Sequence, residues 1–72
     1  MRKLRDSHIV GDFEGWDGDK VYELDDGSRW ELTLYQYKYV YRHRPRVRIW
    51  QDGGRYLFDV EGMNGKVEVR AV

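Results

Sequence analysis

The 72-residue chain contains no cysteine, so no disulfide stabilises it, and it has no Cys/His cluster of the kind that holds a structural zinc. No apolar run approaches the roughly 20 residues of a membrane-spanning helix. The charged segment Met1–Ser7 has neither the apolar stretch of a signal peptide nor that of an anchor. These absences predict a single cytoplasmic domain of bacterial type, without a membrane partner, that depends on its hydrophobic core for stability.

The common signatures of enzymes and cofactor sites are also missing. His8 and His43 lie far apart in the sequence, and neither has acidic neighbours at the spacing of metal ligands. No serine or threonine sits in a nucleophile motif, and the glycine pairs fall where hairpins turn instead of forming a phosphate loop. The acidic segment 12–19, DFEGWDGD, lacks the ligand spacing of an EF-hand calcium loop. We therefore expect no enzyme activity, no cofactor, no metal and no small-molecule substrate.

What the sequence does contain is repeated alternation of apolar and polar residues between turn signals, with no sustained helical periodicity. Each turn signal supplies glycine or asparagine for the backbone conformations of tight hairpins. The four signals are Asp17-Gly18, Asp26-Gly27, Asp52-Gly53-Gly54 and Asn64-Gly65. The pattern predicts an all-β fold, specifically a small SH3-like antiparallel barrel of five to six strands over residues 9–72, preceded by an N-terminal extension over residues 1–8.

These turns also predict which strand residues face each other, and directly opposed residues share one side of a sheet. The predicted pairings place the apolar side chains together on one buried face. A loop at residues 53–54 in place of 52–53 would change one set of partners and preserve the faces. The predicted pairs are Leu24 with Trp30, Asp25 with Arg29 as an ion pair, Ile49 with Tyr56, and Val60 with Val69.

The segment 35–48, YQYKYVYRHRPRVR, has a tyrosine at alternate positions and then a basic stretch. With residues 43–45 as a loop, Tyr41 opposes Val47 and Tyr39 opposes Ile49, so the tyrosines join the buried face; we prefer this interpretation. The change of phase after Leu34 predicts a bulge or loop near residues 34–36. In the alternative, the tyrosines are exposed and stack on the bases of a nucleic acid.

Charge is unevenly distributed along the chain, although the net charge is zero. Residues 12–31 carry eight acids and two bases, whereas residues 32–50 carry five bases and no acid. The predicted pairing leaves a basic outer face with Asp59 opposite Arg46, and Trp50 stacks on Arg55 or Lys38. Such a face attracts the chain's own acidic segment, that of a second copy, or a phosphate. The candidate binding residues are Lys38, Arg42, Arg44, Arg46, Arg48 and Trp50.

From residue 9 to the end, the sequence resembles a group of uncharacterised small bacterial proteins, including ones carried on integrons and other mobile gene cassettes. The resemblance rests on the order of Gly-Trp-x-Gly-Asp, Leu-x-x-Gly-x-x-Trp, the alternating tyrosines, Arg-Pro-x-Val and a closing Gly-Gly hairpin. It implies a small SH3-like β-barrel and transfers no catalytic residue and no function.

Together these observations predict a non-catalytic binding or interaction module. Its expected partner is a protein, with a homodimer as one form of that interaction. The alternative is a nucleic-acid-binding protein that contacts phosphates through Arg42, Arg44, Arg46 and Arg48. An enzyme whose site forms only between subunits is a third class, and no residue pattern favours it.

Overall fold

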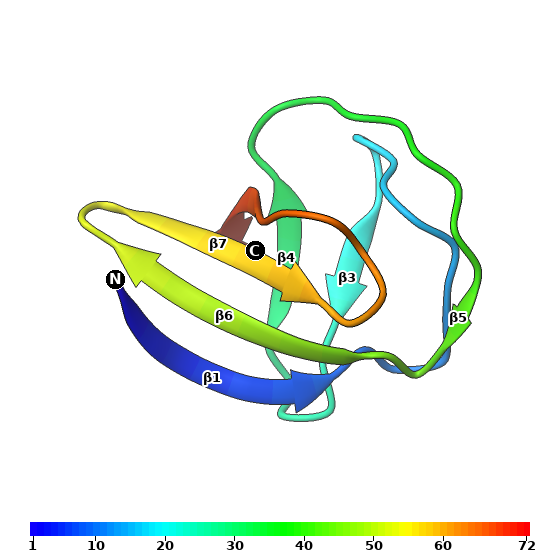
Figure 1. Ribbon diagram of the computed structural model, residues 1–72, viewed down its shortest axis with the longest axis horizontal. Coiled ribbons are helices and arrows are strands. Elements are labelled where there is room, and N and C mark those ends of the chain that lie inside the picture. Colours follow the sequence, from blue (N-terminus) through cyan, green and yellow to red (C-terminus); the bar gives the residue numbers. More distant parts are fainter.

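The computed structural model describes residues 1–72 and contains eight strands and no helix, so no helix is present that could cross a membrane (Figure 1). Six strands form one antiparallel sheet in the order β1-β6-β7-β8-β4-β3, and β2 pairs with β5 in a second, two-stranded sheet. The predicted all-β, barrel-like fold is confirmed. The strands are β1 (Arg2–His8), β2 (Asp12–Phe13), β3 (Val21–Glu23), β4 (Arg29–Leu32), β5 (Arg42–His43), β6 (Arg46–Asp52), β7 (Arg55–Val60) and β8 (Val67–Ala71).

The large sheet curls until its two edge strands meet. After β1 the chain crosses to the end of β3, where Ile9 forms an isolated bridge with Leu24. The Val10 N–H donates to the Glu23 carbonyl at 2.9 Å, and the Asp25 N–H donates to the His8 carbonyl at 2.9 Å. These bonds satisfy backbone groups that an open sheet would leave unpaired, so they close one end of the barrel.

Residues 1–8 were predicted to be an extension outside the barrel, but residues 2–8 form strand β1 of the large sheet. It pairs antiparallel with β6, from His8 opposite Arg46 to Arg2 opposite Gln51, with an irregularity between Lys3 and Arg5. The segment is nearly all polar and exposed, so it has no apolar alternation of its own. Its strand conformation comes from the ladder of hydrogen bonds to β6, which a local pattern does not reveal.

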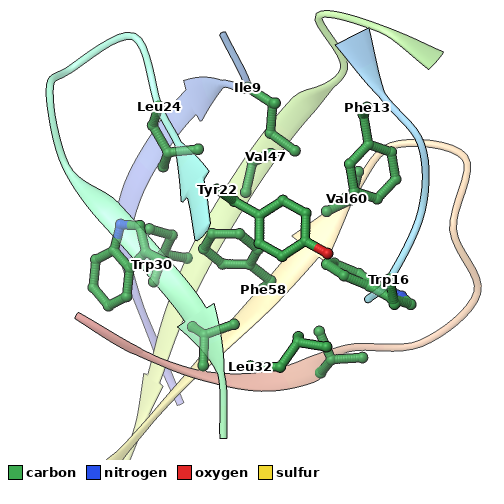
Figure 2. Close-up of a cluster of buried hydrophobic side chains, with 13 residues drawn as sticks. Ile9, Phe13, Trp16, Tyr22, Leu24, Trp30, Leu32, Val47, Phe58 and Val60 are labelled. Carbon is green, nitrogen blue, oxygen red and sulfur yellow. The ribbon is translucent and has the colours of Figure 1, made fainter. Parts of the chain in front are cut away.

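The side chains that the large sheet contributes to the core are ones that the alternation predicted to be buried (Figure 2). Phe58 lies at its centre, fully buried, with the rings of Trp16, Tyr22 and Trp30 around it at centroid distances of 6.1–6.4 Å. Each large apolar side chain buried in this way stabilises the fold by about 1.5–3 kcal/mol. The strands contribute Phe13, Tyr22, Trp30, Leu32, Val47, Ile49, Phe58, Val60, Val67 and Val69, and the loops contribute Ile9, Trp16 and Leu24.

Three hairpin registers differ from the preferred predictions, each by an even number of residues. Ile49 pairs with Phe58, as the loop at residues 53–54 predicted. Val69 pairs with Tyr56 instead of Val60, and Trp30 pairs with Tyr22 instead of Leu24. Because side chains alternate with a period of two, an even shift leaves every buried residue on the same face. Two loops are longer than predicted and the loop between β6 and β7 is displaced by one residue, and these changes altered the partners and preserved the core.

Candidate functional site

The predicted burial of the alternating tyrosines is wrong. Strand β6 already pairs with β1 on one side and β7 on the other, so it has no free edge for residues 35–41. Strand β4 ends at Leu32, and the chain then leaves the sheet, as the predicted loop near residues 34–36 requires. Figure 1 shows this segment arching round the side of the barrel to β5. The exposed side chains are Leu34 (72%), Tyr35 (73%), Tyr37 (69%), Tyr39 (61%) and Tyr41 (56%), which we call the tyrosine row.

The row is held by residues 12–16 instead of β6. Trp16 and Lys38 exchange two backbone hydrogen bonds, of 2.8 and 3.1 Å. Gly15 permits this close approach, because a side chain at Gly15 would collide with the Lys38 carbonyl and its φ of 96° disfavours other residues. Further along, Phe13 pairs with Arg42 where β2 meets β5. The large apolar side chains of residues 12–16 are buried in the core, and the tyrosines beside them are exposed.

One end of the row contacts Asp12. The Tyr41 hydroxyl donates to Asp12 Oδ1 at 3.1 Å, and His43 Nδ1 lies 2.8 Å from the same oxygen. The hydrogen bond with His43, and then that from Tyr41, hold the pKa of Asp12 below its usual value. The Asp12 carboxylate in turn raises the pKa of Tyr41, and the charge of Glu14 adds a smaller contribution. Tyr41 and two carboxylates of residues 12–16 therefore lie close together.

The other end of the row contacts the Gly18 turn. The Tyr35 ring lies so close to Gly18 that any side chain at that position would collide with it. Gly18 is flanked by Asp17 and Asp19, and the Asp17 side chain accepts the Asp19 N–H at 3.1 Å. Acidic residues therefore lie beside the row at both ends.

The arginines of the predicted basic face are paired with acids from distant parts of the chain. Arg46 makes a bidentate contact with Asp6, at 2.8 Å from Nε and 2.6 Å from Nη2. This contact holds the pKa of Asp6 well below its usual range and raises the pKa of Arg46. Arg48 Nη1 lies 3.7 Å from Asp59, which the sequence had placed opposite Arg46. The outward orientation of both arginines is as predicted, and their charges are balanced locally.

Arg44 has a positional role at the junction of three segments. Its Nη2 donates to Asp25 at 2.6 Å, so the predicted pair of Asp25 with Arg29 does not form. Its N–H donates to the Gly11 carbonyl at 2.9 Å, and its φ of 48° is left-handed, which is uncommon for a residue with a side chain. These two bonds hold the residue that precedes β6 by two positions against Gly11 and Asp25, beside the hydrogen bonds that close the barrel.

The six predicted binding residues lie in β5, in β6 and in the segments next to these strands. Lys38 and Arg42 belong to the segment that carries the row, and the Arg42 guanidinium lies against Gly62. Trp50 lies on the outer face of β6 beneath the Lys66 ammonium, 5.9 Å from the ring centroid, and not beside Arg55 or Lys38. Its indole N–H is buried and has no hydrogen-bond partner.

The outer face also has one shallow depression, of about 80 Å³, lined by Arg46, Arg48, Asp59 and Glu61. Its two positive and two negative side chains cancel, so it attracts neither anions nor cations strongly. No group of three or more His, Asp or Glu side chains is arranged to hold a metal ion. The tyrosine row is thus the most distinctive exposed feature of the molecule, because clustered exposed apolar side chains mark interaction sites.

Comparison with known proteins gives no further guidance, because no family model, no curated protein and no solved structure matches this chain. The resemblance to small bacterial cassette proteins stays a prediction.

Proposed function

We propose that this protein is a non-catalytic binding module that recognises another protein through the tyrosine row. The observation that carries the proposal is the exposure of four tyrosines within seven residues, each more than half exposed, in a chain whose other large aromatic residues are buried or partly buried. Tyrosine gives a large, rigid contact area at a low entropy cost and is enriched at protein interfaces. A partner that covers the row would bury these rings.

Nucleic-acid binding is the second candidate, because exposed rings can stack on bases. The charges around the row oppose it. Arg44, Arg46 and Arg48 are each paired with an acid of the same chain, so a phosphate would have to displace that acid. The acids beside the row would repel the phosphate backbone. A protein partner therefore agrees better with the electrostatics.

The proposal is tested with a double variant, Tyr37→Ser and Tyr39→Ser, and a matched control, Leu4→Ser and Val72→Ser, which removes exposed apolar side chains from other strands and the C-terminus. Proteins retained from a host lysate by the wild-type domain are purified, and direct binding is measured by calorimetry. We expect a partner whose affinity falls at least about tenfold, or 1.4 kcal/mol, with the tyrosine variant and is unchanged with the control.

Partners that bind the tyrosine variant as tightly as the wild type would overturn the proposal. Fluorescence anisotropy with single-stranded and duplex oligonucleotides, at low and high salt, tests the second candidate. Phosphate-driven binding is strongest at low salt. Oligonucleotide binding at low salt that depends on Tyr37 and Tyr39 would replace the protein partner with a nucleic acid.

A further inference from the structure

We infer that the partner segment bound by the tyrosine row is an extended, basic stretch of polypeptide that presents arginine or lysine side chains to the row. The inference rests on the proposed function, and it adds the chemistry of the partner. It follows from the charges around the row, the accessibility of those charges, and the spacing of the rings.

The segment beside the row is negatively charged. Residues 12–19 contain four acids and no base. Asp12 accepts the Tyr41 hydroxyl, Glu14 lies near enough to affect the ionisation of Tyr41, and Tyr35 packs on the turn between Asp17 and Asp19. Carboxylates therefore border the row at both of its ends.

Most of these carboxylates are exposed to solvent and therefore accessible to a partner. The Asp12 and Glu14 side chains are 51% and 55% exposed, and Asp19 is exposed as well. The Lys20 ammonium lies 4.0 Å from Glu14, and an exposed pair of this kind contributes little. Lys38 pairs with Trp16 through the backbone, and its exposed side chain forms no ion pair with an acid of the border. The other basic side chain in contact with the border is His43, whose Nδ1 lies 2.8 Å from Asp12 Oδ1 and which is charged only when it is protonated.

Rings and carboxylates attract the same group. A cation over a tyrosine ring gains about 0.5–1 kcal/mol when exposed and about 2 kcal/mol or more when water is excluded. A guanidinium can also donate charge-assisted hydrogen bonds to carboxylates nearby. A partner carrying acids would instead be repelled by the border, so charge complementarity favours arginine and lysine.

The backbone of the row favours an extended partner segment. Residues 38–43 run antiparallel to residues 12–16, with a one-residue shift in register between Lys38 and Arg42, and alternate residues of an extended chain are about 6.6 Å apart. Side chains at alternate positions of an extended peptide have the same spacing. Basic side chains at alternate positions of such a peptide can therefore lie beside rings of the row.

The test uses fluorescein-labelled peptides of alternating arginine and glycine, with a glutamate–glycine peptide of equal length as comparison. Anisotropy is measured with the wild type, with Tyr37→Ser and Tyr39→Ser, with Glu14→Gln and Asp19→Asn, and with the control Glu23→Gln and Glu68→Gln, which removes two acids outside the border. We expect salt-sensitive binding of the arginine peptide alone, weakened about tenfold by each of the first two variants and less than about twofold by the control. Thermal unfolding of each variant confirms that it is folded.

Two results overturn the inference and leave the proposed function standing. The first is a purified partner that needs Tyr37 and Tyr39 but is not basic where it binds. The second is concentration-dependent sedimentation of the domain that the tyrosine variant abolishes, which would make the occupant a second copy. Equal binding of both peptides, no binding of the arginine peptide, or full binding by the Glu14 and Asp19 variant also contradicts it. If no purified partner depends on Tyr37 and Tyr39 for binding, the proposed function itself is contradicted.

Discussion

Aromatic side chains of the core and of the tyrosine row have similar chemistry and opposite surroundings. In the core, Phe13 and Trp16 meet edge to face at 5.3 Å between centroids, and Trp16 meets Tyr22 in the same way at 5.6 Å. In the row, Tyr41 contacts a carboxylate and Tyr35 contacts a glycine, and each ring is more than half exposed. The difference shows that strand pairing, and not residue type, decides which rings stabilise this fold. The predictions below test that comparison.

The largest effect is expected at the centre of the core. Replacing Phe58 by alanine removes a fully buried ring that contacts Trp16, Tyr22 and Trp30. Such a change costs about 3–5 kcal/mol, which is comparable to the whole stability of a domain of this size. We expect Phe58→Ala to be largely unfolded at room temperature, with loss of near-ultraviolet circular dichroism. An unchanged urea midpoint would show that Phe58 is not central to the core.

A smaller effect is expected from a single hydroxyl. The buried Tyr22 hydroxyl donates to the Gly15 carbonyl and accepts the Asp17 N–H, both at 3.0 Å. Tyr22→Phe keeps the ring and leaves these backbone groups without partners, which costs about 1–3 kcal/mol. Urea denaturation should show this loss, and hydrogen exchange of the Asp17 amide should become faster. The control is Tyr56→Phe, since the Tyr56 hydroxyl makes no hydrogen bond and should change stability little.

The alternation of apolar and polar residues predicted which side chains of the strands are buried, because an error of an even number of residues in the register leaves each side chain on the same face. Shifts of two and four residues moved Trp30 and Val69 to new partners and kept both buried. The site was predicted less well, because it depends on an edge strand that carries no apolar pattern. Strand β1 takes its conformation from its pairing with β6, and this pairing displaces the tyrosines from the position that the alternation favoured.

The charge of the predicted site depended on contacts that are distant in sequence. Arg46 is neutralised by Asp6, and Arg44 by Asp25, across separations of 40 and 19 residues. Counting charges within one segment misses such pairs, because it compares neighbours in sequence and not in space. The tyrosine spacing allowed exposed rings as the alternative interpretation. The preferred interpretation was wrong because it paired the tyrosines with β6.

The Asp6–Arg46 pair predicts a small, pH-dependent effect. The pKa of Asp6 is lower in the folded state than in the unfolded chain, because Arg46 stabilises the carboxylate. The pair therefore stabilises the fold above the unfolded pKa of about 3.9, and the stabilisation is lost as the pH falls towards the folded value. Asp6→Asn should lower the urea midpoint at pH 7, and the difference from the wild type should shrink as the pH falls below about 4.

The control for this pH dependence is Asp59→Asn, because Asp59 lies farther from its arginine, at 3.7 Å, and accepts no hydrogen bond from it. The difference in urea midpoint between the wild type and Asp59→Asn should depend less on pH than the difference between the wild type and Asp6→Asn. A constant difference between wild type and Asp6→Asn from neutral to acidic pH would mean that the bidentate pair does not persist in solution.

The smallest effect is expected in the row itself. Tyr39 is 61% exposed and its hydroxyl makes no hydrogen bond, so Tyr39→Ala should change the free energy of unfolding by no more than about 0.5 kcal/mol. The same replacement at Phe58 costs several times more, although both remove one aromatic ring. Urea denaturation of the two variants side by side measures the contrast. A loss above about 1 kcal/mol for Tyr39→Ala would mean that the ring is packed against the domain in solution. The row would then offer no free surface, and both the proposed protein contact and its basic partner would lose their basis.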